Sequence, residues 1–169
     1  EGTSLNEYAN EEGKVLSDWG DSGWGFMVKE DKNKGVRFRN ELIDAFVEML
    51  KKWDPQPRPK WVTCVPSLAQ PRLVREFAES VARELALPFA PVLERSIEVK
   101  PQASKENSFH KMHNVAGSVG FTPKLNIPSE PVLLLDDTVD SRWTLTVTGA
   151  LLRRRGVPEV FPAALANCQ

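Results

Sequence analysis

The chain has 169 residues, of which 41% are hydrophobic and 27% are charged, and its formal net charge is -1. This length and composition suit one globular domain with its own core. The near-neutral charge argues against a uniformly basic nucleic-acid-binding module, although it permits a local basic patch. No apolar run approaches the roughly 20 residues that span a bilayer, and no signal peptide is recognisable, so we expect no membrane partner and a cytoplasmic location.

The first part of the chain is polar, so we expect a loose lead-in over residues 1–17 and a single domain over residues 18–169. Since the chain does not begin with Met, we also expect a fragment of a larger protein. The sequence contains no Gly-rich Walker loop, so we expect no ATPase motor within it. Trp19 and Trp24, which glycines flank, either cover an edge of the core or form a hood over a site.

Helical and strand-like patterns alternate over the rest of the chain. Asn40 is placed to cap a helix whose apolar residues recur on one face. Pro71 opens a second helix, and Gly156 stops a third. The predicted elements are a helix from Asn40 to the Pro-rich segment 54–59, a strand at 60–65, a helix at 71–85, strands at 89–93 and 132–135, a helix at 144–155 and a strand at 160–165.

The strand at 132–135 has no polar alternation, which is typical of a strand covered on both faces. Strand, helix and strand in succession form a parallel crossover unit. We therefore predict an α/β fold with a central, mostly parallel sheet flanked by helices on both faces. Residues 62–65 and 132–135 are expected to be neighbouring or near-neighbouring strands of this sheet.

Two carboxylates, Asp136 and Asp137, end the apolar run at 132–135, and hydroxyls and a helical pattern follow them. Ligands of parallel α/β sheets bind beyond the carboxyl ends of the strands, so we expect both side chains to point into the crevice. Adjacent carboxylates suit a vicinal diol or a ligand that carries Mg²⁺, and the amides at the next helix start suit a phosphate. Diol and phosphate together indicate a ribose 5-phosphate.

A second loop, residues 66–70, follows the first predicted central strand and precedes a helix. A helix N-terminus offers unpaired amides and partial positive charge, so Ser67 and Leu68 are candidates for holding an anion. The alternative is a simple strand-to-helix turn in which Ser67 makes local hydrogen bonds.

The segment 95–117 is long, polar and mixed, and loops of more than about 12 to 15 residues within a compact domain are usually functional or disordered. Lys100, Lys105 and Lys111 supply positive charge for a diphosphate or a nucleic-acid backbone. A solvated charged loop remains the alternative.

The sequence offers no recognisable set of metal ligands. His110 and His113 lie three residues apart without nearby Cys or carboxylate partners. Cys64 lies in a strand-like run and Cys168 next to the end, with no paired spacing. We therefore predict no metal site from these residues, a buried Cys64 and an incidental Cys168.

The run from Pro131 to Leu145 resembles the signature of the type I phosphoribosyltransferases, in which a strand is followed by Asp-Asp, two residues, Asp or Thr, Thr, two small residues such as Gly, and Thr. The resemblance implies that Asp136 and Asp137 hold the ribose hydroxyls and that Asp140 is the catalytic or base-facing acid. It also implies a phosphate site at Ser141, Arg142 and Thr144, a pyrophosphate loop at Ser67 and Leu68, and a lid that contains Lys100, Lys105 and Lys111. Mg²⁺ is implied only together with phosphoribosyl diphosphate.

The chain departs from that signature at Arg142 and Trp143, which stand where small residues are expected. Glycine lets the backbone approach a phosphate closely, so one interpretation is a degenerate loop that has lost turnover. A second interpretation makes Arg142 a bidentate phosphate clamp and Trp143 a stacking surface for a base or a DNA strand. In a third, Trp143 merely packs under the helix.

Further segments follow the order seen in competence-type phosphoribosyltransferases and look most similar to the C-terminal module of bacterial RecQ-like ATP-dependent DNA helicases. They are residues 61–67, 71–78, 87–89, 100–102 and 113–117, with Gly23-Trp24-Gly25 and the loop at 137–144. The resemblance implies that the partners are the remainder of a helicase chain, itself a hydrolase of DNA repair, and DNA, phosphoribosyl diphosphate or a nucleotide.

Three functions follow from this interpretation. The favoured one is an accessory domain of a RecQ-like helicase that binds a phosphorylated ribose, a nucleotide or nucleic acid with little or no transferase turnover. The second is an active Mg²⁺-dependent phosphoribosyltransferase, and the third is a protein-interaction module. The sequence leaves open whether the domain is an enzyme.

Overall fold

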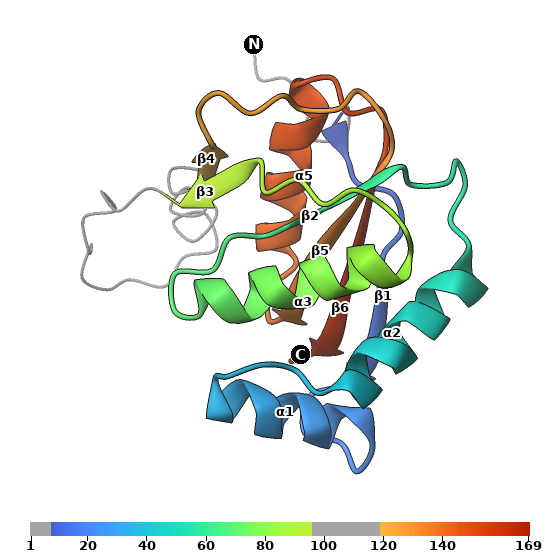
Figure 1. The fold of residues 1–169 in the computed structure, drawn as a ribbon, viewed down its shortest axis with the longest axis vertical. Coiled ribbons are helices and arrows are strands. Elements are labelled where there is room, and N and C mark those ends of the chain that lie inside the picture. Colours follow the sequence, from blue (N-terminus) through green and yellow to red (C-terminus); the bar gives the residue numbers. More distant parts are fainter. Residues whose placement is uncertain (1–7, 96–118) are drawn as a thin grey trace.

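The computed structural model describes residues 8–95 and 119–169, and a four-stranded parallel sheet lies at its centre (Figure 1). The strands are β1 (Lys14–Asp18), β2 (Trp61–Cys64), β5 (Val132–Val139) and β6 (Val160–Asn167), in the spatial order β1-β6-β5-β2. Each pairs with its neighbours in parallel. A separate antiparallel pair joins β3 (Leu93–Arg95) to β4 (Val119–Phe121).

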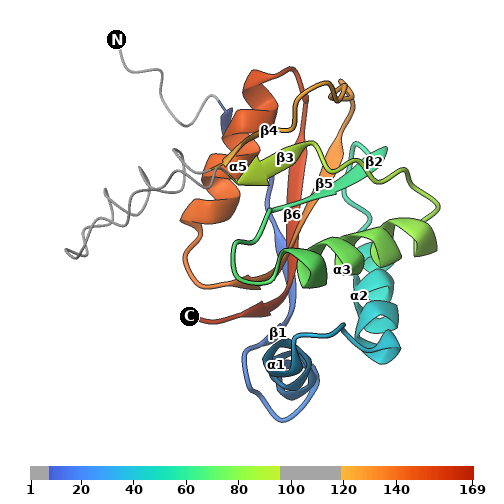
Figure 2. The same cartoon turned by 60° about the vertical axis from the view of Figure 1, so that its left-hand side comes forward.

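Helices cover both faces of the sheet, as Figures 1 and 2 show. The helices α1 (Trp24–Lys34), α2 (Asn40–Trp53) and α3 (Pro71–Glu84) lie on one face, and α5 (Trp143–Arg154) lies on the other. Leu133 and Leu135 of β5 pack in a core cluster with α2 and α3, whereas Val132 and Leu134 pack in a cluster with β3, β4 and α5. The central strand is therefore covered on both faces, as its sequence predicts.

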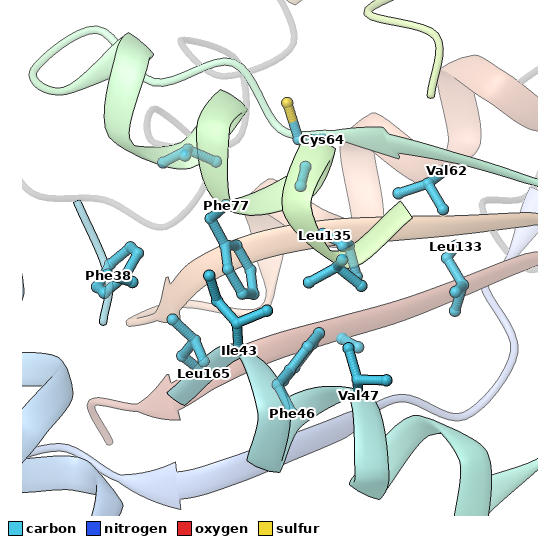
Figure 3. Packing of buried hydrophobic residues seen from close by; sticks show 14 of the residues in the cluster. Phe38, Ile43, Phe46, Val47, Val62, Cys64, Phe77, Leu133, Leu135 and Leu165 are labelled. Atoms are coloured by element: carbon cyan, nitrogen blue, oxygen red, sulfur yellow. The ribbon is translucent and has the colours of Figure 1, made fainter. Parts of the chain in front are cut away.

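Aromatic rings fill the core between α2, α3 and the sheet (Figure 3). Phe77 of α3 packs edge-on against Phe46 of α2, with the ring centroids 5.1 Å apart, and against Phe38 at 5.7 Å. All three rings are almost completely buried. Because edge-to-face contacts add to the gain from burial, this cluster fixes α2 and α3 against β5.

The predicted α/β fold is confirmed. β2 and β5 are direct neighbours, with Val62 paired to Leu133 and Cys64 to Leu135. The three predicted helices correspond to α2, α3 and α5, and the last predicted strand corresponds to β6. Gly156 follows α5 with φ at 98°, a conformation that favours glycine and ends the helix. Within the described residues, no helix combines the length and the apolar character needed to cross a membrane.

The structure differs from the expected lead-in over residues 1–17. Residues 14–17 belong to the edge strand β1, which pairs with β6, and Ser17 Oγ donates a hydrogen bond to the Leu165 carbonyl at 2.8 Å. This strand is only five residues long and three of them are exposed, so it lacks the apolar alternation that predicts a strand. The ordered domain therefore begins before residue 18.

Other elements also depart from expectation. The sequence does not predict α1, because its buried residues are only Gly25, Val28 and Asp31 and form no apolar stripe. The strand expected at 89–93 is regular only from Leu93, while Phe89 forms an isolated bridge to β2. Residue 40 is the first residue of α2 and not its cap, which is residue 39.

Candidate functional site

The acidic pair lies within β5 and not in the loop after it. We expected the strand to end at Leu135, but β5 continues to Val139 because β6 also continues and pairs with it. Asp136 pairs with Ala164, and the Cys168 amide donates to the Val139 carbonyl at 2.7 Å. The pair is therefore held in extended backbone at the carboxyl end of a central strand.

Both carboxylates turn forward along the strand. Asp136 Oδ1 accepts a hydrogen bond from the Asp137 amide at 2.8 Å, and Asp137 Oδ1 accepts one from the Thr138 amide at 2.7 Å. Asp137 is only 5% exposed. Burial, and then the negative charge of Asp137, raise the pKa of the Asp136 carboxyl well above its ordinary value. Burial and the proximity of the two carboxylates therefore disfavour the charged form of Asp136.

A lysine from α1 contacts this pair. Lys32 Nζ lies 3.1 Å from Asp137 Oδ2 and donates a hydrogen bond to Thr138 Oγ1 at 2.7 Å. The same ammonium lies 6.0 Å from the centroid of the Trp19 ring, a cation-π contact. Trp19 also packs against the core, which favours the edge-covering interpretation of this residue. The fold thus supplies an internal cation to the carboxylates.

The loop after β2 lies beside the acidic pair. The Val65 amide donates to the Leu135 carbonyl at 2.9 Å, so the chain leaves β2 next to Asp136. Ser67 Oγ accepts a hydrogen bond from the Gln70 amide at 3.1 Å, the local contact of a strand-to-helix turn, and Leu68 is exposed. The following helix, α3, begins without a side-chain cap and without an acidic residue in its first turn.

A second cation reaches this loop from β3. Arg95 Nε donates a hydrogen bond to the Pro66 carbonyl at 2.7 Å. Burial lowers the pKa of the Arg95 guanidinium, while the negative charge of Asp136 opposes this shift. Arg95 therefore connects β3 to the loop after β2, and its positive charge interacts with the negative charge of Asp136.

The start of α5 carries the residues that replace the expected small ones. Arg142 is exposed at the N-cap position, and Trp143 is the first helical residue. The helix has neither a side-chain cap nor an acidic residue in its first turn. The Thr144 carbonyl in this first turn accepts a hydrogen bond from Thr148 Oγ1 at 2.6 Å. The helix start retains the partial positive charge that favours an anion.

Arg142 and Trp143 also line a groove of about 710 Å³. Its other walls come from β1, β6 and the segment at 9–13 that precedes β1. Asn10 of that segment donates from Nδ2 to the Leu145 carbonyl at 2.9 Å, which ties the segment to α5. Trp143 is partly exposed and therefore presents part of its ring to the groove.

Comparison with known proteins gives similarities of structure only. Neither a protein-family profile nor a curated protein sequence matches the chain. Among solved structures it is similar to the allosteric regulatory enzyme of purine biosynthesis, with a TM-score of 0.50, 17% identity, and coverage of 73% of this chain and 25% of that one. The chain has the type I phosphoribosyltransferase fold.

Two further solved structures with this fold are also similar. Glutamine phosphoribosylpyrophosphate amidotransferase from B. subtilis gives a TM-score of 0.45, 19% identity and coverage of 73% of this chain and 26% of that one. Adenine phosphoribosyltransferase from Saccharomyces cerevisiae gives a TM-score of 0.46 and 16% identity, and the match covers 74% of this chain and 67% of that one. The chain thus spans about a quarter of the length of the purine-biosynthesis enzyme and of the amidotransferase.

Within the phosphoribosyltransferase fold, the predicted site residues fall into three groups. Asp136, Asp137 and the Ser67 loop lie at the adjacent ends of β5 and β2. Asp140, Ser141, Arg142, Trp143 and Thr144 form the turn into α5 and its first residues. Lys100, Lys105 and Lys111 lie outside the described residues, as do His110 and His113.

Sequence reasoning missed Lys32. The two loops at 66–70 and 95–117 contain Gln70 and Arg95, but sequence reasoning gave neither side chain a role. Lys32 lies in a run of charged residues that reads as a solvated surface, and it is 106 residues from Thr138 in the chain. Gln70 Nε2 donates to the Lys32 carbonyl at 2.9 Å, a contact that no local pattern predicts. Cys64 is buried as predicted, and burial raises the pKa of its thiol to about 12.

The phosphoribosyltransferase fold raises the question of whether Mg²⁺ fits the acidic pair. Mg²⁺ prefers a near-octahedral shell of oxygen ligands at close distance. One oxygen of Asp137 already contacts the Lys32 ammonium, and the described residues contain no group of three or more His, Cys, Asp or Glu side chains arranged for a metal. Asp137 Oδ2 is therefore not open to Mg²⁺ while Lys32 keeps this contact.

Proposed function

We propose that the chain is an accessory domain that binds a phosphorylated ribose or nucleotide at the carboxyl ends of β5 and β2, with little or no transferase turnover. The observation that carries the proposal is the convergence of an acidic pair with two uncapped helix starts, those of α3 and α5, on a phosphoribosyltransferase fold. Carboxylates suit sugar hydroxyls, and helix N-termini suit phosphate.

Arg142 supports phosphate binding at the second of these helix starts. It is exposed, and its guanidinium is able to form two parallel hydrogen bonds to phosphate oxygens. The absence of acidic residues from the first turn of α5 leaves the helix dipole uncompensated there. Both features favour a dianionic group over a neutral ligand.

Two features support weak or absent turnover. Arg142 and Trp143 add side chains where close approach of the backbone to a transferring group needs small residues. The internal ion pair between Lys32 and Asp137 also leaves less negative charge for stabilising a positive ribosyl centre. We therefore expect the domain to bind its ligand with little or no transferase turnover.

The groove beside α5 favours a ligand that extends beyond the sugar phosphate. Trp143 offers a ring for a base to stack on, and such stacking contributes about 1 to 3 kcal/mol per base in single-strand binding. A nucleotide or a DNA strand end fits this combination of ring, guanidinium and helix start. Attachment to a RecQ-like helicase, which we also propose, rests on sequence resemblance.

An active transferase is the second candidate. The observation that favours it is the retained pair of forward-facing carboxylates at the end of β5. An active transferase has to turn over phosphoribosyl diphosphate with a suitable base. Exchange of labelled pyrophosphate into phosphoribosyl diphosphate measures this turnover directly.

Calorimetry with ribose 5-phosphate tests the favoured proposal. We expect saturable binding by the unmodified chain, weaker binding by Arg142→Glu because its carboxylate repels phosphate, and little change in Arg58→Glu, an exposed arginine after α2. Pyrophosphate exchange with a panel of bases is expected to be absent or very slow. Brisk exchange establishes the transferase instead, and equal affinity in both variants removes Arg142 from the site.

A further inference from the structure

A cation of the protein itself contacts one member of the acidic pair, Asp137. Lys32 Nζ lies 3.1 Å from Asp137 Oδ2 and 2.7 Å from Thr138 Oγ1, so it takes two oxygen atoms at the end of β5. Asp137 is 5% exposed and the Lys32 side chain is 28% exposed, so the ion pair is partly buried. Partly buried ion pairs are screened less than those on the surface.

Several contacts hold Lys32 in this position. The Gln70 side-chain amide donates to the Lys32 carbonyl at 2.9 Å. Its neighbour Asp31, also 5% exposed, accepts hydrogen bonds from the Arg39 amide at 2.8 Å and from Arg39 Nε at 3.0 Å. These bonds tie α1 to the start of α2 and to the loop before α3. These contacts hold the backbone of α1 at Lys32 in place beside β5, while the Lys32 side chain is 28% exposed.

A divalent cation at the same carboxylates conflicts with this arrangement. Mg²⁺ has to displace the ammonium from Asp137 or lie within a few ångströms of it, where two positive groups repel each other. The ammonium also supplies charge without demanding an octahedral shell.

We propose that Lys32 occupies the place of a divalent cation at Asp137, so that this domain binds a phosphorylated ribose without Mg²⁺. The inference rests on the proposed function, because it concerns the same sugar phosphate at the same strand ends. In this proposal α1, the helix that the sequence does not predict, holds Lys32 beside Asp137.

Two titrations of the 169-residue chain test this proposal. The first is calorimetry with ribose 5-phosphate, performed once with Mg²⁺ and once with EDTA at matched ionic strength. The second is titration with Mn²⁺ alone, followed by electron paramagnetic resonance, which needs no sugar. Each is repeated on Lys32→Met, on Lys32→Arg and on Lys29→Met, an exposed lysine on the same helix.

For the unmodified chain we expect affinities for ribose 5-phosphate that agree within about twofold in the two buffers, and no Mn²⁺ bound at the pair. Lys32→Met is expected to gain one Mn²⁺ site and an increase in sugar-phosphate affinity of about tenfold on adding Mg²⁺. Lys32→Arg retains a cation and Lys29→Met leaves the pair untouched, so both are expected to behave like the unmodified chain. Thermal melting checks that each variant is folded.

The outcomes separate this inference from the proposed function. If the unmodified chain binds ribose 5-phosphate in neither buffer, the proposed function fails, and the Mn²⁺ titration decides the role of Lys32 alone. An affinity that rises tenfold with Mg²⁺ in the unmodified chain overturns the inference. So does a Mn²⁺ site in the unmodified chain that Asp137→Asn abolishes. Both readouts remain decisive if Lys32→Met does not fold.

Discussion

Asp136 lies within β5, where burial and the charge of Asp137 raise the pKa of its carboxyl well above the ordinary value. Above pH of about 4, the ordinary pKa of Asp, the unfolded chain has released this proton while the folded chain still binds it. The contribution of Asp136 to the free energy of unfolding therefore falls as pH rises from about 4 to its raised native pKa.

We accordingly expect Asp136→Asn to gain stability over the unmodified chain as pH rises through this window, with no gain below it. Urea denaturation at a series of pH values measures the difference between the two proteins. Asp140→Asn, an exposed neighbour, is the control and is expected to show no such trend. Parallel curves for Asp136→Asn and the unmodified chain contradict the assignment.

Replacing the adjacent carboxylate, Asp137, is expected to lower the stability of the fold instead of raising it. Asp137→Asn removes the charge that Lys32 contacts from a side chain only 6% exposed, so we expect a loss on the order of 1–3 kcal/mol in the free energy of unfolding at neutral pH. The measurement is urea denaturation. A variant as stable as the unmodified chain shows that the Lys32 ion pair contributes nothing to folding.

At this scale the sequence predicts only some of the site. Asp136 and Asp137 are conspicuous because two acids end an apolar run. Their environment is not predictable in the same way, because Lys32 and Arg95 reach the strand ends from separate parts of the chain. Strand pairing with β6 also decides that the pair is in extended backbone, and no local residue pattern contains that information.

Among the elements, α5 depends on the segment that precedes β1. Asn10 lies directly against Gly149, and a Cβ at position 149 overlaps its side-chain oxygen. We expect Gly149→Ala to displace this segment and to cost about 1–3 kcal/mol, the usual range for overpacking. Urea denaturation measures the loss. Gly120→Ala is the control, because a Cβ at position 120 meets open space.

A double variant separates this contact from a general effect of alanine. Asn10→Ala removes the overlapping side chain, so Gly149→Ala is expected to cost less in that background than in the unmodified chain. Additive losses mean that the two residues do not interact.

The elements that the sequence predicts are those with a strong apolar pattern. α2 and α3 each bury a continuous stripe, and β2 and β5 are runs of buried residues. β1 and α1 lack such a pattern, because β1 has no buried residue and the buried residues of α1 are Gly25, Val28 and Asp31. Both elements depend on contacts with distant segments, since β1 pairs with β6 and Lys32 of α1 contacts Asp137.

For the whole molecule, the order of strands follows from a few sequence features. A buried run without alternation belongs at the centre of a sheet, and crossover helices make its neighbours parallel. The similarity to known structures agrees with this fold at 17% identity, where the fold alone is established. Which ligand is bound, and whether it is turned over, depend on the side chains at the strand ends.

The central claim is that the anion site lies where the loops after β2 and β5 enter α3 and α5. Its most direct test is a titration of the ¹⁵N-labelled chain with ribose 5-phosphate, followed by the shifts of backbone amide resonances. We predict saturable shifts of the amides at residues 67–70 and 140–145, with little change at the far ends of the same helices. Saturable binding that leaves both loops unshifted, or that shifts only amides elsewhere, contradicts the account.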